Sequence, residues 1–122
     1  MQSVTSNAVY NACVKVEETT NIGTFNFYSK SVKKNGKVVY IDLEIYGGNT
    51  SLAVNSINVV ATLPEGFRPA RRCGFPLANI DSGDGHYKET WFCEILTDGK
   101  IRVITGSYAT DFCYIHTCFL TS

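Results

Sequence analysis

The sequence predicts an all-β domain, either an antiparallel Greek-key barrel or a jelly-roll-like sandwich. Seven or eight short segments have the composition of strands, with turn residues about every 8–12 positions. Alternation of period two is clearest in one segment, where branched aliphatic residues take every second position: Val39, Ile41, Leu43 and Ile45. The 122 residues are enough to bury a core as one domain.

Residues 1–17 contain the one segment with helical spacing, and residues 18–122 make up the β domain. Four residues fall at i, i+3, i+4 and i+7 and form a narrow apolar seam: Val9, Ala12, Cys13 and Val16. Because so short a helix is marginal in water, it must dock on something. It could dock on its own domain or in a parallel bundle with identical helices, and its small residues favour the bundle. Met1 directly before it also suggests a C-terminal piece of a longer protein.

The first hairpin is predicted around Asn35-Gly36, since an Asn-Gly pair suits a tight turn in which both positions have positive φ. Its first strand starts within residues 24–29. Its second strand is the alternating segment, which ends at Gly47-Gly48.

Five further strands are predicted after the first hairpin, at residues 56–62, 73–81, 86–96, 101–105 and 112–120. Residues 97–100, Thr-Asp-Gly-Lys, form a tight turn. A hairpin centred between Asp98 and Gly99 pairs Ile95 with Arg102 and places Trp91 on the same face as Arg102, roughly 13 Å away. A slip of one residue would send Trp91 and Arg102 to opposite faces.

Composition excludes several functions. The 11 basic and 11 acidic residues balance and are spread out, so nucleic acid is not an expected partner. No apolar run approaches the ~20 residues of a membrane span, so membrane insertion is not expected. The five cysteines include no CxxC pair; we expect small buried side chains in a reducing compartment and no metal site.

Catalysis is not expected, and neither is a cofactor. The sequence lacks the nucleophile-elbow, zinc-protease and phosphate-loop motifs. Asp42 and Glu44 share the outer face of the central strand, where we interpret them as solubilising rather than as the paired carboxylates of a glycosidase.

A saccharide site is the better candidate, because sugars are bound by an aromatic ring under their C–H face and by polar groups at their hydroxyls. The residues that could form it are the single tryptophan and three polar neighbours in the sequence: Trp91, Arg102, His86 and Asp84. Alternatives remain open for three of them. Trp91 could be a core or subunit-interface aromatic, His86 an exposed turn residue and Arg102 part of an interface salt bridge. His116 is expected in the interior or at a subunit axis.

Three stretches resemble segments of phage tail proteins. Residues 4–10, VTSNAVY, resemble a segment that precedes the C-terminal domain of tail-fibre and baseplate proteins. Residues 57–69, INVVATLPEGFRP, resemble the strand, Leu-Pro-x-Gly, aromatic, Arg-Pro stretch of tail receptor-binding heads. The hairpin at residues 97–101 is similar to one in the same setting. The family resembled is the C-terminal receptor-binding head of long-tailed phage tail-fibre and baseplate proteins.

The resemblance implies a homotrimeric head on a helical neck that recognises saccharide on a bacterial surface. Such heads use Trp, Arg, His and Asp near a subunit boundary, which points again to Trp91, Arg102, His86 and Asp84. It also implies attachment to the rest of the tail fibre or baseplate through the N-terminus, and a place in the virion tail after synthesis in the host cytoplasm. The alternatives are a purely structural trimerisation cap, a fragment of a polysaccharide-degrading tail enzyme, and a free-standing lectin-like domain.

Overall fold

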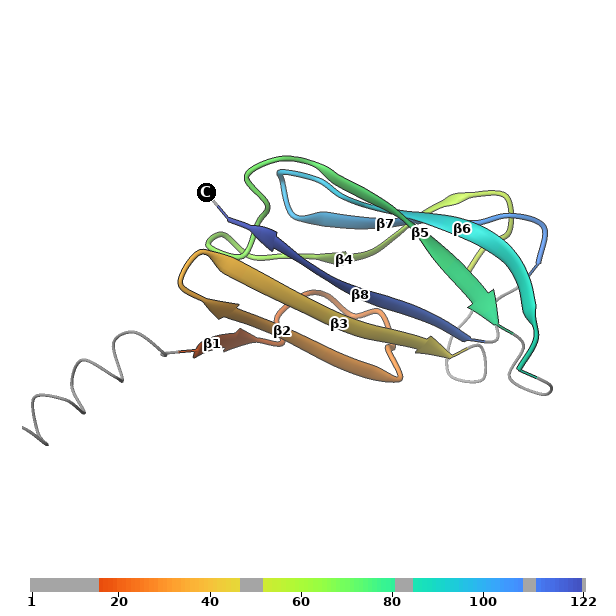
Figure 1. Ribbon diagram of the computed structural model, residues 1–122, viewed down its shortest axis with the longest axis horizontal. Coiled ribbons are helices and arrows are strands. Elements are labelled where there is room, and N and C mark those ends of the chain that lie inside the picture. The colour runs from red at the N-terminus through yellow and green to blue at the C-terminus, as the bar shows by residue number, and fades with distance from the viewer. Residues whose placement is uncertain (1–15, 47–51, 81–84, 109–111, 122) are drawn as a thin grey trace, which may run out of the picture.

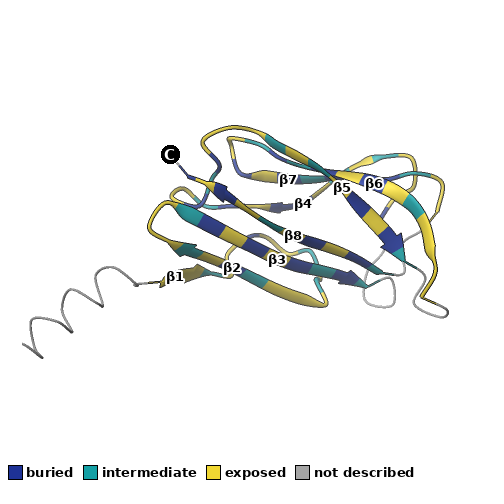
Figure 2. Cartoon of the chain, viewed as in Figure 1, coloured by how far each residue is buried: buried dark blue, intermediate teal, exposed yellow. Residues whose placement is uncertain are grey.

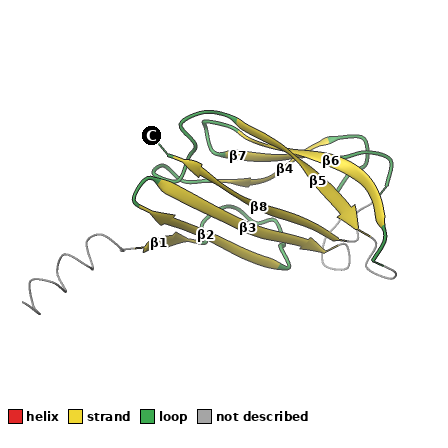
Figure 3. Cartoon of the chain, viewed as in Figure 1, coloured by secondary structure: helices red, strands yellow, loops and turns green. Residues whose placement is uncertain are grey.

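The computed structural model describes residues 16–46, 52–80, 85–108 and 112–121. This part of the chain is all-β, with eight antiparallel strands that curl into a half-barrel and no helix (Figure 3). The strands are β1 (Val16–Thr19), β2 (Ser29–Asn35), β3 (Val38–Tyr46), β4 (Ile57–Thr62), β5 (Cys73–Ile80), β6 (Tyr87–Ile95), β7 (Lys100–Ile104) and β8 (Phe112–Leu120). The predicted fold class is therefore confirmed at the level of an antiparallel β domain.

The strand order is β1-β2-β3-β8-β5-β6-β7-β4. Only two residue pairs join β5 to β8, Asn79 with Cys113 and Ile80 with Phe112. The sheet folds over at this short joint, so two halves face each other (Figure 1). We call them the β3 half (β1, β2, β3 and β8) and the β6 half (β5, β6, β7 and β4). In the β6 half, the strands β5, β6 and β7 follow one another as hairpins. β4, which precedes them in the chain, lies beside β7, and this arrangement is a Greek key.

The core lies between the two halves and follows the predicted alternation. The inward residues of β3 (Val39, Ile41, Leu43 and Ile45) are all 0% exposed. Buried residues alternate with half-buried or exposed ones along β3 in Figure 2. The β6 half covers them with inward residues of β6 and β7: Trp91, Cys93, Ile95, Ile101 and Val103. Burial of apolar side chains from both halves is what holds the curled sheet closed.

The β2–β3 turn lies one residue later than predicted. Asn35 pairs with Val38, so the turn residues are Gly36 and Lys37. Gly36 has a φ of 62°, and Lys37 does not have positive φ. A glycine with positive φ at the first of two turn positions is typical of a type II′ hairpin, which demands positive φ of one residue rather than two.

The predicted N-terminal helix is wrong at its C-terminal end. Val16, expected on the helical seam, begins β1, where it pairs with Asn35 and is 53% exposed. Valine is β-branched and favours a strand over a helix, and in β1 its backbone also pairs with the otherwise unpaired edge of β2. Glu17 and Glu18 belong to the same strand, across the predicted boundary between helix and β domain. The other seam residues, Val9, Ala12 and Cys13, lie outside the described residues.

The described cysteines are free, and two of them match the prediction of small buried side chains. Cys93 and Cys113 are fully buried, and burial raises the pKa of each thiol to about 12. Cys73 is half-buried and Cys118 is exposed, so the prediction does not hold for every cysteine. The described residues contain no helix long and apolar enough to cross a membrane.

Candidate functional site

Trp91, the predicted sugar-stacking ring, lies in the core. It is 1% exposed, on the inward side of β6. Its indole Nε1 donates a hydrogen bond to Glu89 Oε1 at 2.8 Å. The structure thus has the alternative that the sequence left open, a core aromatic, because the inward alternation of β6 includes this position. A buried indole has no free face on which a sugar could stack.

The β6–β7 register also differs from the predicted one. Ile95 pairs with Ile101 rather than with Arg102, so Arg102 points outward while Trp91 points inward. The cause is a three-residue loop instead of a two-residue turn. The Leu96 amide donates to the Lys100 carbonyl, and Gly99, with a φ of 91°, takes the left-handed position of such a loop. The expectation that Trp91 and Arg102 share a face is wrong.

Arg102 is paired within the chain. Its Nη2 lies 3.3 Å from Glu94 Oε1, and Arg72 Nη1 lies 3.9 Å from Glu94 Oε2. His86 is exposed just before β6, and Asp84 lies outside the described residues. The structure therefore does not bring the predicted set together: Trp91 is inside, Arg102 is on the outer face of the β6 half, and His86 is at one end of β6.

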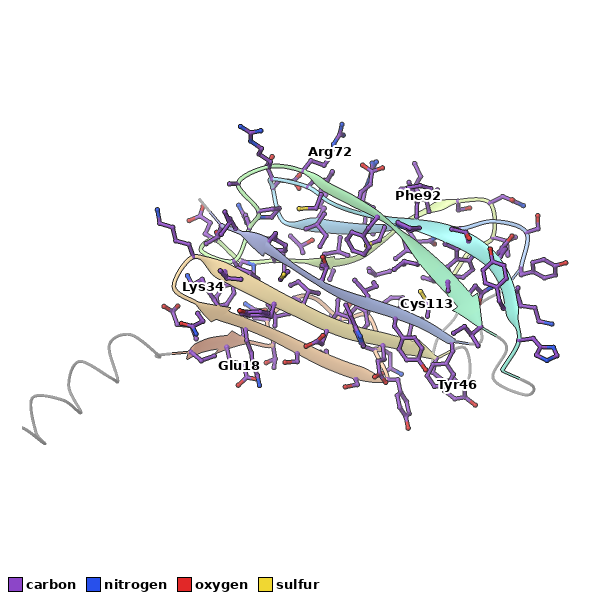
Figure 4. All side chains as sticks on the ribbon, in the orientation of Figure 1. Glu18, Lys34, Tyr46, Arg72, Phe92 and Cys113 are labelled. Atoms are coloured by element: carbon purple, nitrogen blue, oxygen red, sulfur yellow. The ribbon has the colours of Figure 1, made fainter. Side chains whose placement is uncertain are left out.

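A different group of side chains lies together on the outer face of the β3 half. Rings from three segments form a continuous series of contacts, which we call the aromatic strip: Tyr28, Tyr46, Phe112, Tyr114 and His116. Ring centroids lie 5.1 Å apart for Tyr46 and Phe112, and 5.4 Å apart for Phe112 and Tyr114. Figure 4 shows Tyr46 at the end of β3.

The pairing of β3 with β8 builds the aromatic strip. Tyr46 lies directly opposite Phe112, and residues two apart on β8 share the outer face, so Tyr114 and His116 continue the series. The Tyr114 and His116 rings lie 5.7 Å apart. Tyr114 is 39% exposed and His116 is exposed, so His116 is not interior, and its other expected place, at a subunit axis, stays a prediction.

Carboxylates lie beside these rings. Asp42 is opposite His116 and exposed, and Glu44 is opposite Tyr114 and half-buried. Neither carboxylate forms an ion pair with a described residue. Rings flanked by free carboxylates can pack on the C–H face of a sugar and accept hydrogen bonds from its hydroxyls. The sequence signal was present as aromatic residues at alternate positions of residues 112–116, but only the β3–β8 pairing joins it to Tyr46.

Glu89, which is hydrogen-bonded to Trp91, has a structural role. The hydrogen bond from the Trp91 indole, and then those from the Tyr108 and Ser107 amides, lower the pKa of Glu89 below its usual range. The carboxylate thereby ties the loop after β7 to β6. A Cβ on Gly106 would lie 2.5 Å from Glu89 Oε2, so the absence of a side chain there makes room for this contact.

The described residues contain no group of three or more His, Cys, Asp or Glu side chains that could hold a metal ion. The sequence matches no protein-family model and no curated protein. The fold and the aromatic strip thus define the class in structural terms: a small antiparallel β domain that displays aromatic rings and free carboxylates on one outer sheet face.

Proposed function

We propose that the chain is a receptor-binding domain of a long-tailed phage tail, which recognises bacterial surface saccharide without catalysis. The observation that carries the proposal is the aromatic strip: a continuous series of ring contacts, with exposed and half-buried rings, and with Asp42 and Glu44 alongside. The saccharide lies along the strip, with its C–H faces on Tyr114 and Phe112 and its hydroxyls donating to the carboxylates. This assignment replaces Trp91 with the rings of β8.

We further propose that the domain works as a homotrimer joined to the rest of the tail fibre or baseplate through its N-terminus. The outer face of the β6 half supports subunit contact, because Phe92, Ile57 and Val59 are 53–58% exposed there. The charges beside them, Arg102 and Glu94, neutralise each other. Apolar surface with internally paired charge suits an interface between subunits. Three shallow sites on one particle would add avidity to weak individual binding.

The test is a glycan array of bacterial wall saccharides probed with the wild-type chain and with Tyr114→Ala. We expect the substitution to weaken binding about tenfold, because it removes the exposed ring that lies between Phe112 and His116 in the aromatic strip. The matched control is Tyr108→Ala, which removes a tyrosine outside the strip that is 54% exposed, against 39% for Tyr114, and should bind as wild type. Unchanged binding by Tyr114→Ala would remove the strip from the site.

A structural trimerisation cap is the second candidate, and the exposed apolar face of the β6 half favours it. Light scattering, combined with the glycan array, distinguishes the cap from the receptor-binding domain. A mass of three chains with no saccharide bound supports the cap, and a mass of three chains with binding supports the receptor-binding domain. A stable single chain contradicts both.

A further inference from the structure

A pocket of about 510 Å³ opens where the two edges of the curled sheet approach each other. One wall is β4, an edge strand that pairs with β7 alone among the described strands. The opposite wall is the segment of residues 21–25, which follows β1. The Thr62 amide donates to the Ile22 carbonyl at 2.9 Å and joins the two walls at one point. This volume is within the range of small-ligand sites, about 300–1,000 Å³.

The lining of this pocket, which we call the edge pocket, carries one formal charge. Its polar side chains are those of Asn21, Thr24, Thr62 and Arg68, and Phe25 contributes a ring. Neither Asp nor Glu is among the lining residues. Binding of an anion is therefore opposed by no like charge in the pocket wall.

Arg68 is held in place by a hydrogen bond, but its positive charge has no ion-pair partner among the described residues. Its Nε donates to the Leu63 carbonyl at 3.0 Å, the side chain is half-buried, and no described carboxylate pairs with it. The neighbouring cation Lys34 differs, because its Nζ lies 3.6 Å from Glu17 Oε2 and 2.8 Å from the Gly66 carbonyl. Arg68 thus keeps two terminal amino groups for a ligand, and its anchored Nε lowers the entropy cost of binding.

We propose that the edge pocket binds the anionic group of an acidic surface sugar, a carboxylate or a phosphate. The free amino groups of Arg68 can make two parallel hydrogen bonds to either anion. Phe25 packs on the sugar ring, and the Thr24 and Thr62 hydroxyls reach its substituents. This second site is separate from the aromatic strip and rests on the proposed function only for the sugar nature of the ligand.

The experiment is an amide NMR titration of the whole chain with glucuronate, glucose 6-phosphate and glucose at millimolar concentrations. We expect one or both anionic sugars to shift the amides of Ile22, Gly23, Ala61 and Thr62, glucose to leave them in place, and added NaCl to weaken the shifts. The anion that binds more tightly identifies the source of the charge. Equal shifts with glucose, or no shifts with either anion, would overturn the proposal.

Two variants assign the effect to Arg68. Arg68→Gln should weaken binding of the anionic sugar at least tenfold, whereas Arg71→Gln, which removes an exposed arginine that does not line the edge pocket, should bind as wild type. If Arg68→Gln does not fold, Arg68→Lys keeps the charge and loses the paired hydrogen bonds; wild-type affinity in that variant would contradict the role of Arg68.

The outcome is separable from that of the aromatic strip. Tyr114→Ala should leave the titration of the edge pocket unchanged, so loss of saccharide recognition at the strip does not decide the edge pocket. Shifts confined to residues 112–116 would place the anionic sugar on the strip and overturn the proposal. Shifts of the β4 amides with an extended acidic peptide, but with neither anionic sugar, would also overturn it, since β4 would then be pairing with a peptide strand.

Discussion

The two halves of the sheet are alike on their inner faces and different on their outer faces. Inside, both present apolar side chains to one shared core. Outside, the β3 half displays the aromatic strip, whereas the β6 half displays Phe92, Ile57 and Val59. Figure 4 shows Phe92 on β6 and Tyr46 on β3. Packing constrains the inner faces to the same chemistry, so the outer faces are where function can differ.

The carboxylates show the same contrast. Glu94 on the β6 half forms ion pairs with Arg102 and Arg72. Asp42 and Glu44 on the β3 half form no ion pair with a described cation. A carboxylate already paired within the chain has less to offer a sugar hydroxyl than a free one. This difference is why we propose polar-ligand recognition for the outer face of the β3 half and subunit contact for that of the β6 half.

The largest expected effect is that of Trp91→Ala, which tests whether stability depends on the inner face of the sheet more than on the outer face. We expect it to lower the free energy of unfolding by about 3–5 kcal/mol, because it leaves a large cavity between the halves and removes the indole partner of Glu89. Tyr114→Ala, on the outer face, should change stability by no more than about 0.5 kcal/mol. Urea unfolding followed by circular dichroism measures both. Trp91→Ala with wild-type stability would contradict the core position of the indole.

Replacing one glycine in each tight hairpin compares the β2–β3 turn of the β3 half with the β6–β7 loop of the β6 half. Gly99→Ala should cost about 3 kcal/mol, because φ is 91° there and the new Cβ would collide with the Leu63 carbonyl. Gly36→Ala should cost about 1 kcal/mol, because φ is 62° but nothing lies within 4 Å of the new Cβ. Thermal unfolding of the two variants ranks them. Equal losses would show that the Leu63 contact is not tight.

The buried thiols of the core make stability depend on pH. Cys93 and Cys113 keep their protons until about pH 12 in the folded chain, whereas the unfolded chain loses them near 9.0. Stability from these thiols is therefore complete below pH 9 and falls as the pH rises toward 12, by about 1.4 kcal/mol for each thiol at pH 10. Urea unfolding between pH 8 and 10 measures the decline.

The control for the thiol effect removes both groups. The double variant Cys93→Ala with Cys113→Ala should lose the part of the alkaline decline that belongs to these two thiols. An identical decline in the double variant would assign the effect to other groups.

Much of the fold could be predicted because it depends on local pattern. The alternation of Val39, Ile41, Leu43 and Ile45 identifies the inward face of β3, since side chains of a strand alternate whatever its neighbours are. The strand predicted at residues 112–120 has the same bounds as β8. Turn geometry was harder: the β2–β3 turn lies one residue later than predicted, and the β6–β7 pairing is shifted by one residue, because adjacent turn types fit the same Gly-containing sequences.

The candidate site could not be predicted in the same way. By itself the sequence determined strands β2 to β8, the alternation within β3 and the lack of a charge pattern for nucleic acid. Only the tertiary structure decided that Trp91 lies inside, that Arg102 pairs with Glu94, and that β8 lies beside β3 so that Tyr46 meets Phe112. The physical reason is that a strand's own residues specify two faces, whereas its neighbours, register and the folding of the sheet specify which face is buried and what lies beside it.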